Sequence, residues 1–244
     1  MRRALRAEWR KARTVRSIGL LLAGAIVVEI AFKGLFAALQ PLDHFDRAGQ
    51  YRQLAPTLFL SLAVATLGVL IAGQEWRYRL AVPTYLALPD RLRVLAAKTV
   101  VASGLATTTG LAATGIANAV CGVVLGARTE PHVPFTDGVV IVLGTALACG
   151  LLAAGGVALG TLVRSQVGAV GVATVLLLVL APLTQVLVPE VAAALPNGAG
   201  LALALQDRAD PAYLGPVAGG LLLAAEIAAV TVLAARRLRR ADVA

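Results

Sequence analysis

The sequence has few charged residues, little cysteine and histidine, and almost no lysine. Only 14% of its 244 residues are charged and 59% are hydrophobic, whereas soluble domains are about 25% charged and about 45–50% apolar. The two cysteines, Cys121 and Cys149, both fall inside apolar runs, where small packed side chains are expected rather than a disulfide framework or a metal site. This composition excludes an ordinary soluble domain and favours an integral membrane protein.

Motifs for catalysis and nucleotide binding are also missing. His44 and His132 belong to no His-Glu-x-x-His pattern, and no Gly-x-Ser-x-Gly pattern occurs. Gly155 and Gly160 have the glycine spacing of a Walker motif, but Thr161 follows them where that motif needs a lysine. We therefore expect no catalytic site, no metal and no cofactor in this chain, and any ATP hydrolysis must come from a separate protein.

Long apolar runs predict six membrane-spanning helices, because a span needs about 20 mostly apolar residues. The runs cover residues 18–39, 54–73, 94–125, 138–163, 167–188 and 214–235. The segments 40–53 and 127–137 between them are expected to be short outer loops. The predicted fold is an all-α integral membrane protein, with a six-span domain over residues 18–244 and both ends of the chain on one side.

Basic residues are distributed unequally between the two sets of loops. The loops expected outside hold Arg47, Arg52, Arg128 and Arg208, beside the acidic Asp43, Asp46, Glu130 and Asp137. The two terminal segments and the other loops hold Arg2, Arg3, Arg6, Arg10, Lys11, Arg13, Arg16, Arg77, Arg79, Arg91, Arg93, Lys98, Arg164, Arg236, Arg237, Arg239 and Arg240. The positive-inside rule then places both termini in the cytoplasm.

The type and position of the basic residues indicate the kind of genome that encodes the protein and the kind of partner that it binds. Lys11, Lys33 and Lys98 are the only lysines, and this excess of arginine amid abundant Ala, Gly, Leu and Val indicates coding by a GC-rich bacterial genome. The expected location is therefore a bacterial cytoplasmic membrane. A net charge of +9 could suggest nucleic acid, but we expect no such partner, because the charge lies at the ends of apolar runs.

Residues 1–17 are predicted to form an amphipathic helix at the membrane surface. Leu5, Trp9 and Ala12 fall at i, i+4 and i+7 and would form one apolar stripe. The surrounding arginines and Lys11 suit anionic lipid headgroups, and Trp9 suits the interface. The alternative is a basic flank that only sets the topology of the first span.

Residues 74–98 form a loop that is too polar to remain in the membrane and too long for a simple turn. Pro83 and Pro89 punctuate it, which predicts a short helix over 84–88 and a new helix after Pro89. The apolar side chains of the short helix and the arginines that frame it are Tyr85, Leu86, Leu88, Arg77, Arg79, Arg91 and Arg93. Such a patch favours docking of a soluble partner, and the alternative is a connector that lies on the lipid headgroups.

Residues 189–213 differ from the other outer segments. Pro189, Pro196 and Pro211 interrupt them, and the apolar stretch 201–205 is too short to span a bilayer. Broken backbone at membrane depth must be covered by protein. The pattern therefore predicts a short re-entrant or interfacial segment before the last span.

Glu29, Lys33 and Glu226 lie inside predicted spans. Intramembrane ionisable groups are costly and usually face the interior of a bundle, so these residues are candidates for a transport path. The alternative is a structural role, in which Glu29 and Lys33 pair at i and i+4 on one helix. In that case Glu226 would pack against a threonine or Asn118.

Two basic segments carry a family resemblance. The stretch Glu8-Trp9-Arg10-Lys11-Ala12-Arg13 precedes the first span, and after the second span come Glu75, Trp76, Arg77, Pro89, Arg91, Arg93, Ala97 and Lys98. Both segments resemble those of permease subunits of type-2 ATP-binding-cassette (ABC) transporters, an exporter family with a six-span membrane domain. The loop departs from that family in its middle, with Arg79-Leu80-Ala81-Val82 where Gly-Thr-Ile-Arg is usual.

The resemblance implies export or flipping of a substrate by a complex with ABC ATPase subunits and a second permease copy or paralogue. It also implies that the N-terminal helix and the loop contact the ATPase. The docking residues would then be Trp9, Glu75, Trp76, Arg77, Tyr85, Leu86, Leu88, Arg91 and Arg93. The alternative function is a non-transporting membrane protein that anchors or regulates a partner through the same surfaces.

Overall fold

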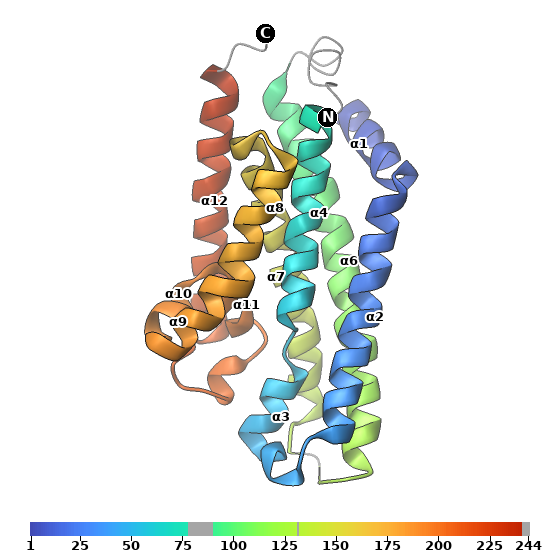
Figure 1. Ribbon diagram of the computed structural model, residues 1–244, viewed down its shortest axis with the longest axis vertical. Coiled ribbons are helices and arrows are strands. Elements are labelled where there is room, and N and C mark those ends of the chain that lie inside the picture. The colour runs from blue at the N-terminus through green and yellow to red at the C-terminus, as the bar shows by residue number, and fades with distance from the viewer. Residues whose placement is uncertain (78–89, 131, 241–244) are drawn as a thin grey trace.

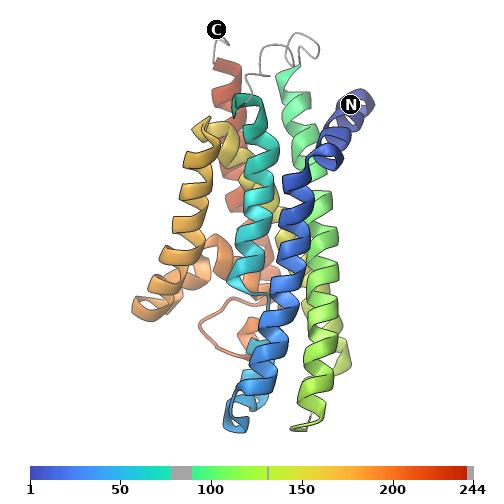
Figure 2. The same ribbon diagram turned by 45° about the vertical axis from the view of Figure 1, so that its right-hand side comes forward.

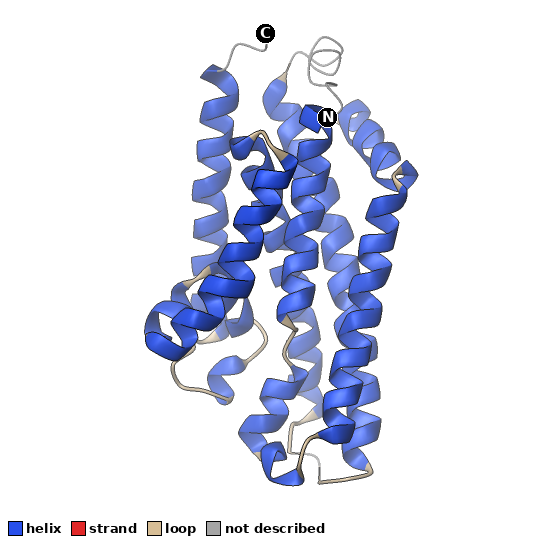
Figure 3. Ribbon diagram, viewed as in Figure 1, coloured by secondary structure: helices blue, strands red, loops and turns tan. Residues whose placement is uncertain are grey.

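The computed structural model describes residues 1–77, 90–130 and 132–240, and every regular element in them is a helix (Figures 1 and 3). In chain order these are α1 (Arg2–Thr14), α2 (Arg16–Leu39), η1 (Leu42–Phe45), α3 (Arg47–Leu54), α4 (Leu58–Arg77), α6 (Arg91–Gly126), α7 (Phe135–Val163), α8 (Gln166–Thr174), η2 (Val175–Leu180), α9 (Ala181–Leu187), α10 (Pro189–Ala194), α11 (Pro196–Ala202), η3 (Gln206–Arg208) and α12 (Pro216–Arg240). The elements η1 and η3 are 3-10 helices, and η2 is a π-helix. The all-α prediction is confirmed for these residues.

Six helical segments are long and apolar enough to cross a membrane, as the apolar runs predicted. They are Arg16–Leu39, Arg47–Gln74, Arg91–Gly126, Phe135–Val163, Gln166–Leu187 and Pro216–Arg240. The largest difference from the prediction is in the second segment, which begins at Arg47 and not near residue 54. The third has 36 residues and is about 54 Å long, so it extends beyond a hydrocarbon core of roughly 30 Å.

The helices run along one axis, so the molecule has two distinct ends. At one end lie α1, the C-terminal ends of α4 and α12, and the start of α6; we call this the terminal end (Figure 1). At the opposite end lie η1 and α3, and we call this the α3 end. Figure 2 shows α2 and α6 side by side over most of their length. That the terminal end faces a cytoplasm stays a prediction.

The core is built around α7, which packs against α4, α6 and α12. It approaches α4 backbone to backbone at two glycines. A Cβ placed on Gly156 would lie 2.1 Å from the carbonyl oxygen of Ala65, and one on Gly68 would lie 2.0 Å from that of Ala153. The two backbones therefore touch through small residues, which is the usual way that membrane helices pack closely.

The second of these helical segments is broken between α3 and α4. Pro56 has no N–H to bond the carbonyl of Arg52, and the residue before a proline avoids helical dihedrals. Ala55 is accordingly extended, with φ −64° and ψ 154°. Asp46 caps α3, because its side chain accepts a hydrogen bond of 2.7 Å from a backbone N–H of the first turn. The prediction of a loop over 40–53 is therefore wrong, since η1 and α3 occupy most of that segment.

The fifth span also departs from a regular α-helix. Its π-helix η2 ends just before Pro182, which cannot donate the hydrogen bond that the carbonyl of Leu178 would receive in an α-helix. After α9 the chain folds back through α10 into α11, which packs on α12 and α7. The broken segment predicted for 189–213 is present as these short helices, and its re-entrant or interfacial position stays a prediction.

Candidate functional site

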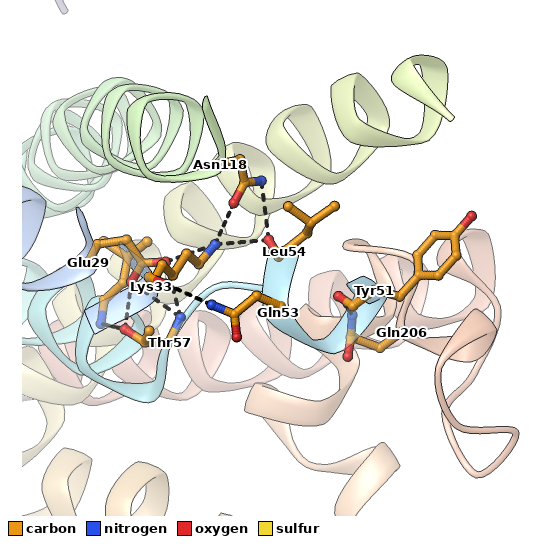
Figure 4. Close-up of polar contacts among 9 residues, drawn as sticks. Glu29, Lys33, Tyr51, Gln53, Leu54, Thr57, Asn118 and Gln206 are labelled. Carbon is orange, nitrogen blue, oxygen red and sulfur yellow. Dashed lines mark hydrogen bonds and ion pairs between the residues drawn. The ribbon is translucent and has the colours of Figure 1, made fainter. Parts of the chain in front are cut away.

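Two charged side chains of α2 meet the broken second span (Figure 4). Lys33 Nζ lies 3.2 Å from Glu29 Oε1, and the side chains are 2% and 0% exposed respectively. The pairing predicted from their i, i+4 spacing is confirmed. A buried ion pair is expensive to desolvate and is retained where further hydrogen bonds satisfy it, so the neighbours of this pair decide its role.

Lys33 bonds the last residue of α3. The carbonyl of Leu54 lacks a helical partner because the helix ends there, and Lys33 Nζ donates to it at 2.9 Å. Asn118 Nδ2 of α6 donates to the same carbonyl at 3.2 Å, and Lys33 Nζ donates to Asn118 Oδ1 at 2.8 Å. Together with Glu29, these acceptors use all the hydrogens of the ammonium group.

Glu29 bonds the other side of the break. Thr57 Oγ1 donates to Glu29 Oε2 at 2.5 Å, and the N–H of Thr57 lies 3.3 Å from both carboxylate oxygens. The Thr57 hydroxyl in turn accepts from the N–H of Leu60 at 3.3 Å, which makes Thr57 the N-terminal cap of α4. The carboxylate also suits the positive end of the helix dipole.

The ion pair therefore holds both halves of a broken helix in one geometry. Gln53 adds a further link, since its Nε2 donates to the carbonyl of Lys33 at 2.9 Å (Figure 4). The sequence indicated the pair but not the groups that it serves, because Leu54 and Thr57 have no distinguishing pattern. Pro56 was the available signal, since a proline ends the helix before it, and the last carbonyls of that helix then lack helical donors.

A cleft of ≈430 Å³ opens beside this break. Its walls come from α2, η1, α3 and the first residues of α4, and Leu178 of η2 also lines it. Both departures from regular α-helix thus border the same cleft. Irregular backbone at membrane depth is tolerated where it is buried in protein or lines a cavity, and π-helices occur frequently at functional sites.

Glu226 of α12 was the third predicted member of a transport path. Its Oε2 atom is buried and has no hydrogen-bond partner in the described part of the chain. Asn118, the partner suggested for it, instead bonds Lys33 and Leu54 with both its polar side-chain atoms. Glu226 therefore forms no hydrogen bond with Asn118, while its packing against a threonine and the transport-path role of all three charged residues stay predictions.

A second buried ion pair joins α1 to α6 at the terminal end. Glu8 Oε2 lies 3.1 Å from Lys98 Nζ, and the side chains of the two residues are 4% and 5% exposed. Lys98 also donates to the carbonyl of Ile71 in α4 at 3.1 Å, and Lys11 Nζ lies 2.7 Å from Glu8 Oε1. We call this arrangement the Glu8–Lys98 clamp. It fastens α1 to the two helices that lead into and out of residues 78–89.

The packed face of α1 differs from the predicted stripe. Ala4, Glu8 and Ala12 are buried, and Leu5 packs against the core. Trp9 is 44% exposed and lies outside this contact. The packed face is centred on the Glu8 carboxylate that binds α6, and the position of Trp9 at the membrane interface stays a prediction.

The docking residues predicted for the loop are only partly described. Tyr85, Leu86 and Leu88 lie outside the described residues, as do the side chains of Glu75, Trp76 and Arg77 at the end of α4. Arg93 is exposed and pairs with Asp90 at 2.8 Å. Arg91 donates to the carbonyl of Leu238 at 3.1 Å, which ties the start of α6 to the end of α12.

A polar cluster at the α3 end was not predicted. Tyr51 is fully buried, its hydroxyl donates to Asp137 of α7, and its carbonyl accepts from Gln206 Nε2 at 2.9 Å. Arg208 pairs with Asp137 and donates to the Tyr51 hydroxyl at 3.2 Å. The hydrogen bond to Tyr51, with the charge of Asp137, raises the pKa of Arg208. These residues come from distant segments, so no local pattern links them.

The described residues show no arrangement of metal ligands. Within residues 1–77, 90–130 and 132–240, no group of at least three His, Cys, Asp or Glu side chains is placed to hold an ion. Cys121 and Cys149 are buried free thiols, which confirms their predicted role as small packed residues.

No protein-family model matches the chain, and no curated protein sequence matches it significantly. The geometry of the broken helix, the cleft and the clamp is therefore the basis on which a function is proposed.

Proposed function

We propose that this chain is the membrane-spanning permease subunit of an ATP-driven ABC transporter, which exports or flips a substrate across a bacterial cytoplasmic membrane. A separate ATPase would dock at the terminal end and supply the energy. A second permease copy or a paralogue would complete the complex. The six apolar helices and the basic segments gathered at one end of the bundle support this proposal.

The observation that carries the proposal is the Glu8–Lys98 clamp. Its buried Lys98 joins α6 to Glu8 of α1 and to the Ile71 carbonyl of α4, each at 3.1 Å, at the terminal end of the bundle. A partner that moves α1 or the loop would therefore move both adjoining helices. Chains of packed side chains, ion-pair networks and rigid helices of this kind carry energetic coupling between distant sites.

The helix α4 connects the clamp to the cleft. Its 20 residues are about 30 Å long. Ile71 near one end is bonded by Lys98, and Thr57 at the other end is bonded by Glu29. An ATPase that binds two orientations of α4 with different affinity would shift the population of two differently exposed states of the cleft.

One observation favours the alternative, a non-transporting membrane anchor or regulator. Every hydrogen of the Lys33 ammonium group is used by a protein acceptor. A polar group that binds a substrate during transport would have to exchange one of these bonds. A protein that only presents its terminal end to a partner needs no such exchange.

Affinity purification from native membranes in mild detergent, with ATP hydrolysis measured in the eluate, tests the proposal. Wild-type protein should retain an ATPase subunit and Glu8→Ala should retain about tenfold less, because the loss of roughly 1.4 kcal/mol of binding energy has that effect. Arg47→Ala at the α3 end is the control and should retain the wild-type amount. If the wild type retains no ATPase, the transporter proposal is wrong; a regulator would retain a partner without ATPase activity.

The orientation needs its own measurement. Single cysteines placed at residue 1 and at Arg47, in a background without Cys121 and Cys149, should react with a membrane-impermeant thiol reagent from opposite sides. Residue 1 should react only from the cytoplasm, because the positive charge gathers at its end. Reaction of both positions from the same side would contradict the proposed topology.

A further inference from the structure

The cleft beside the broken helix has the size and position of a ligand site. Its volume of ≈430 Å³ lies within the roughly 300–1,000 Å³ of small-molecule sites in proteins. It opens at the surface, since Phe32, Phe36 and Phe59 in its walls are 41%, 40% and 48% exposed. A molecule could therefore enter it from the side of the bundle.

The apolar part of the cleft is aromatic. The Phe32 and Phe36 rings are stacked with centroids 5.1 Å apart, and Phe32 meets Phe59 edge-on at 5.9 Å. These rings come from α2 and from the start of α4, both of which belong to predicted spans. In a bilayer they would face hydrocarbon chains, and they form a continuous surface on which a chain can lie.

The polar part of the cleft is basic. Arg52 and His44, both exposed, line it from α3 and η1, and Figure 1 shows these elements beyond the end of α4. No aspartate or glutamate lines the cleft among the described residues. Glu29 neutralises Lys33, so Arg52 supplies the net positive charge. The cleft is thus apolar toward the middle of the bundle and basic toward its α3 end.

We infer that this cleft binds an anionic phospholipid of the membrane, with its phosphate at Arg52 and one acyl chain against Phe32, Phe36 and Phe59. The gradient from aromatic to basic lining matches a molecule with an apolar chain and an anionic head. Arginine is well suited to phosphate because its planar fork donates two parallel hydrogen bonds. The inference does not depend on the transporter proposal, because an anchor or regulator in the same membrane would bind the same lipid.

A tryptophan reporter tests the site in vesicles that contain the permease chain alone. The reporter is Phe59→Trp in a background with Trp9→Phe and Trp76→Phe, and the quenchers are phospholipids with brominated acyl chains. Brominated phosphatidylglycerol, diluted in phosphatidylcholine, should quench the fluorescence of the tryptophan at position 59 at about fivefold lower mole fraction than brominated phosphatidylcholine does. This difference is expected because one basic residue that faces an anionic lipid strengthens its binding by about this factor. Leu221→Trp on α12, at a position that is 68% exposed and distant from the cleft, should be quenched equally by both lipids.

Charge variants on one short helix provide the decisive comparison. Arg52→Gln should remove the preference for phosphatidylglycerol, whereas Arg47→Gln, an exposed arginine of α3 that does not line the cleft, should keep it. If the two variants behave alike, general attraction to the basic surface explains the binding and the inference is wrong. Equal quenching of position 59 by both lipids would overturn it as well.

A second readout avoids the tryptophan substitutions. Wild type, Arg52→Gln and Arg47→Gln, extracted in mild detergent, should be assayed for co-purified phosphatidylglycerol by mass spectrometry. We expect about fivefold less in the Arg52 variant only. Equal amounts in all three proteins would overturn the inference even if Phe59→Trp failed to fold. Because neither experiment measures a retained partner or ATP hydrolysis, failure here leaves the proposed transport function untouched.

Discussion

A buried lysine donates a hydrogen bond to the second helical segment, Arg47–Gln74, at each of two places, but the ion pairs that these lysines form differ. At the α3 end, Lys33 donates to the carbonyl of Leu54 and pairs with Glu29 one helical turn away. At the terminal end, Lys98 donates to the carbonyl of Ile71 and pairs with Glu8, which is 90 residues distant in sequence. One pair is local to a single helix, whereas the other joins separate helices.

The carbonyls of Leu54 and Ile71 also differ in whether they have another hydrogen-bond donor. Leu54 is the last residue of α3, so its carbonyl has no helical donor and requires Lys33. Ile71 lies inside α4, where the helix itself supplies a donor, and its bond to Lys98 is additional. Glu8 keeps Lys11 as a second cation at 2.7 Å. Loss of Lys33 therefore leaves Glu29 without its cation and the Leu54 carbonyl with Asn118 alone, whereas loss of Lys98 leaves Glu8 with Lys11 and the Ile71 carbonyl with its helical donor.

The largest expected effect comes from Lys33→Met. This substitution leaves the Glu29 carboxylate buried without its cation, which should lower the free energy of unfolding by about 3–5 kcal/mol. Thermal unfolding in detergent measures the change. The double variant Glu29→Gln with Lys33→Met should recover part of the loss, because no buried charge remains. If Lys33→Met lowers the free energy of unfolding less than Lys98→Met does, the Glu29–Lys33 pair is not the more important of the two pairs for stability.

The next effect concerns Lys98→Met at the terminal end. The loss should be about 1.5–3 kcal/mol, the size expected for hydrogen bonds to charged groups, because Glu8 keeps Lys11. Hydrogen exchange should become faster in α1, which loses its link to α6, and should not change in the middle of α7. Unchanged exchange in α1 would show that apolar packing of Ala4 and Ala12 holds this helix without the clamp.

A third variant, Tyr51→Phe, changes the polar cluster at the α3 end and leaves the helix break intact. Its effect on stability can therefore be compared with those of the two lysine variants. Losing the hydroxyl that bonds Asp137 and Arg208 should cost about 1–2 kcal/mol by thermal unfolding. Tyr213→Phe is the matched control, since that hydroxyl accepts one bond of 2.7 Å from an exposed Gln185, and it should cost less. If Tyr51→Phe lowers the free energy of unfolding more than Lys98→Met does, the polar cluster at the α3 end contributes more to stability than the clamp.

The smallest effect on stability is expected for Glu226→Gln. The buried Oε2 atom makes no hydrogen bond in the described structure, so the neutral amide should change the free energy of unfolding by no more than roughly 0.5 kcal/mol. Expression and unfolding temperature should match wild type. Transport by the assembled complex should fall if Glu226 lines the path, and unchanged transport would indicate that it only packs within the bundle.

Much of the fold follows from patterns that are local in the sequence. Apolar runs of sufficient length predicted six spans, and the spacing of Glu29 and Lys33 predicted their pairing. The helix over Arg47–Leu54 was missed because Arg47, Gln50 and Arg52 make the segment polar. Its polarity reflects contacts outside the spans: Gln50 is buried and bonds the backbone of Glu130 and His132. A polar helix that packs on other loops has no apolar run to reveal it.

The sequence by itself determined the number of helices long and apolar enough to span a membrane, the placement of both termini at one end, and the Glu29–Lys33 pair, because run length and i, i+4 spacing are properties of short segments. Only the tertiary structure decided that this pair serves Leu54 and Thr57, that Glu8 reaches Lys98, and that a cleft lies beside the break. Hydrogen bonds between segments as much as 157 residues apart depend on which helix faces pack together. Close packing at small residues such as Gly68 and Gly156 determines which helix faces meet. Such residues occur throughout this sequence, so their presence does not reveal which helices they bring together.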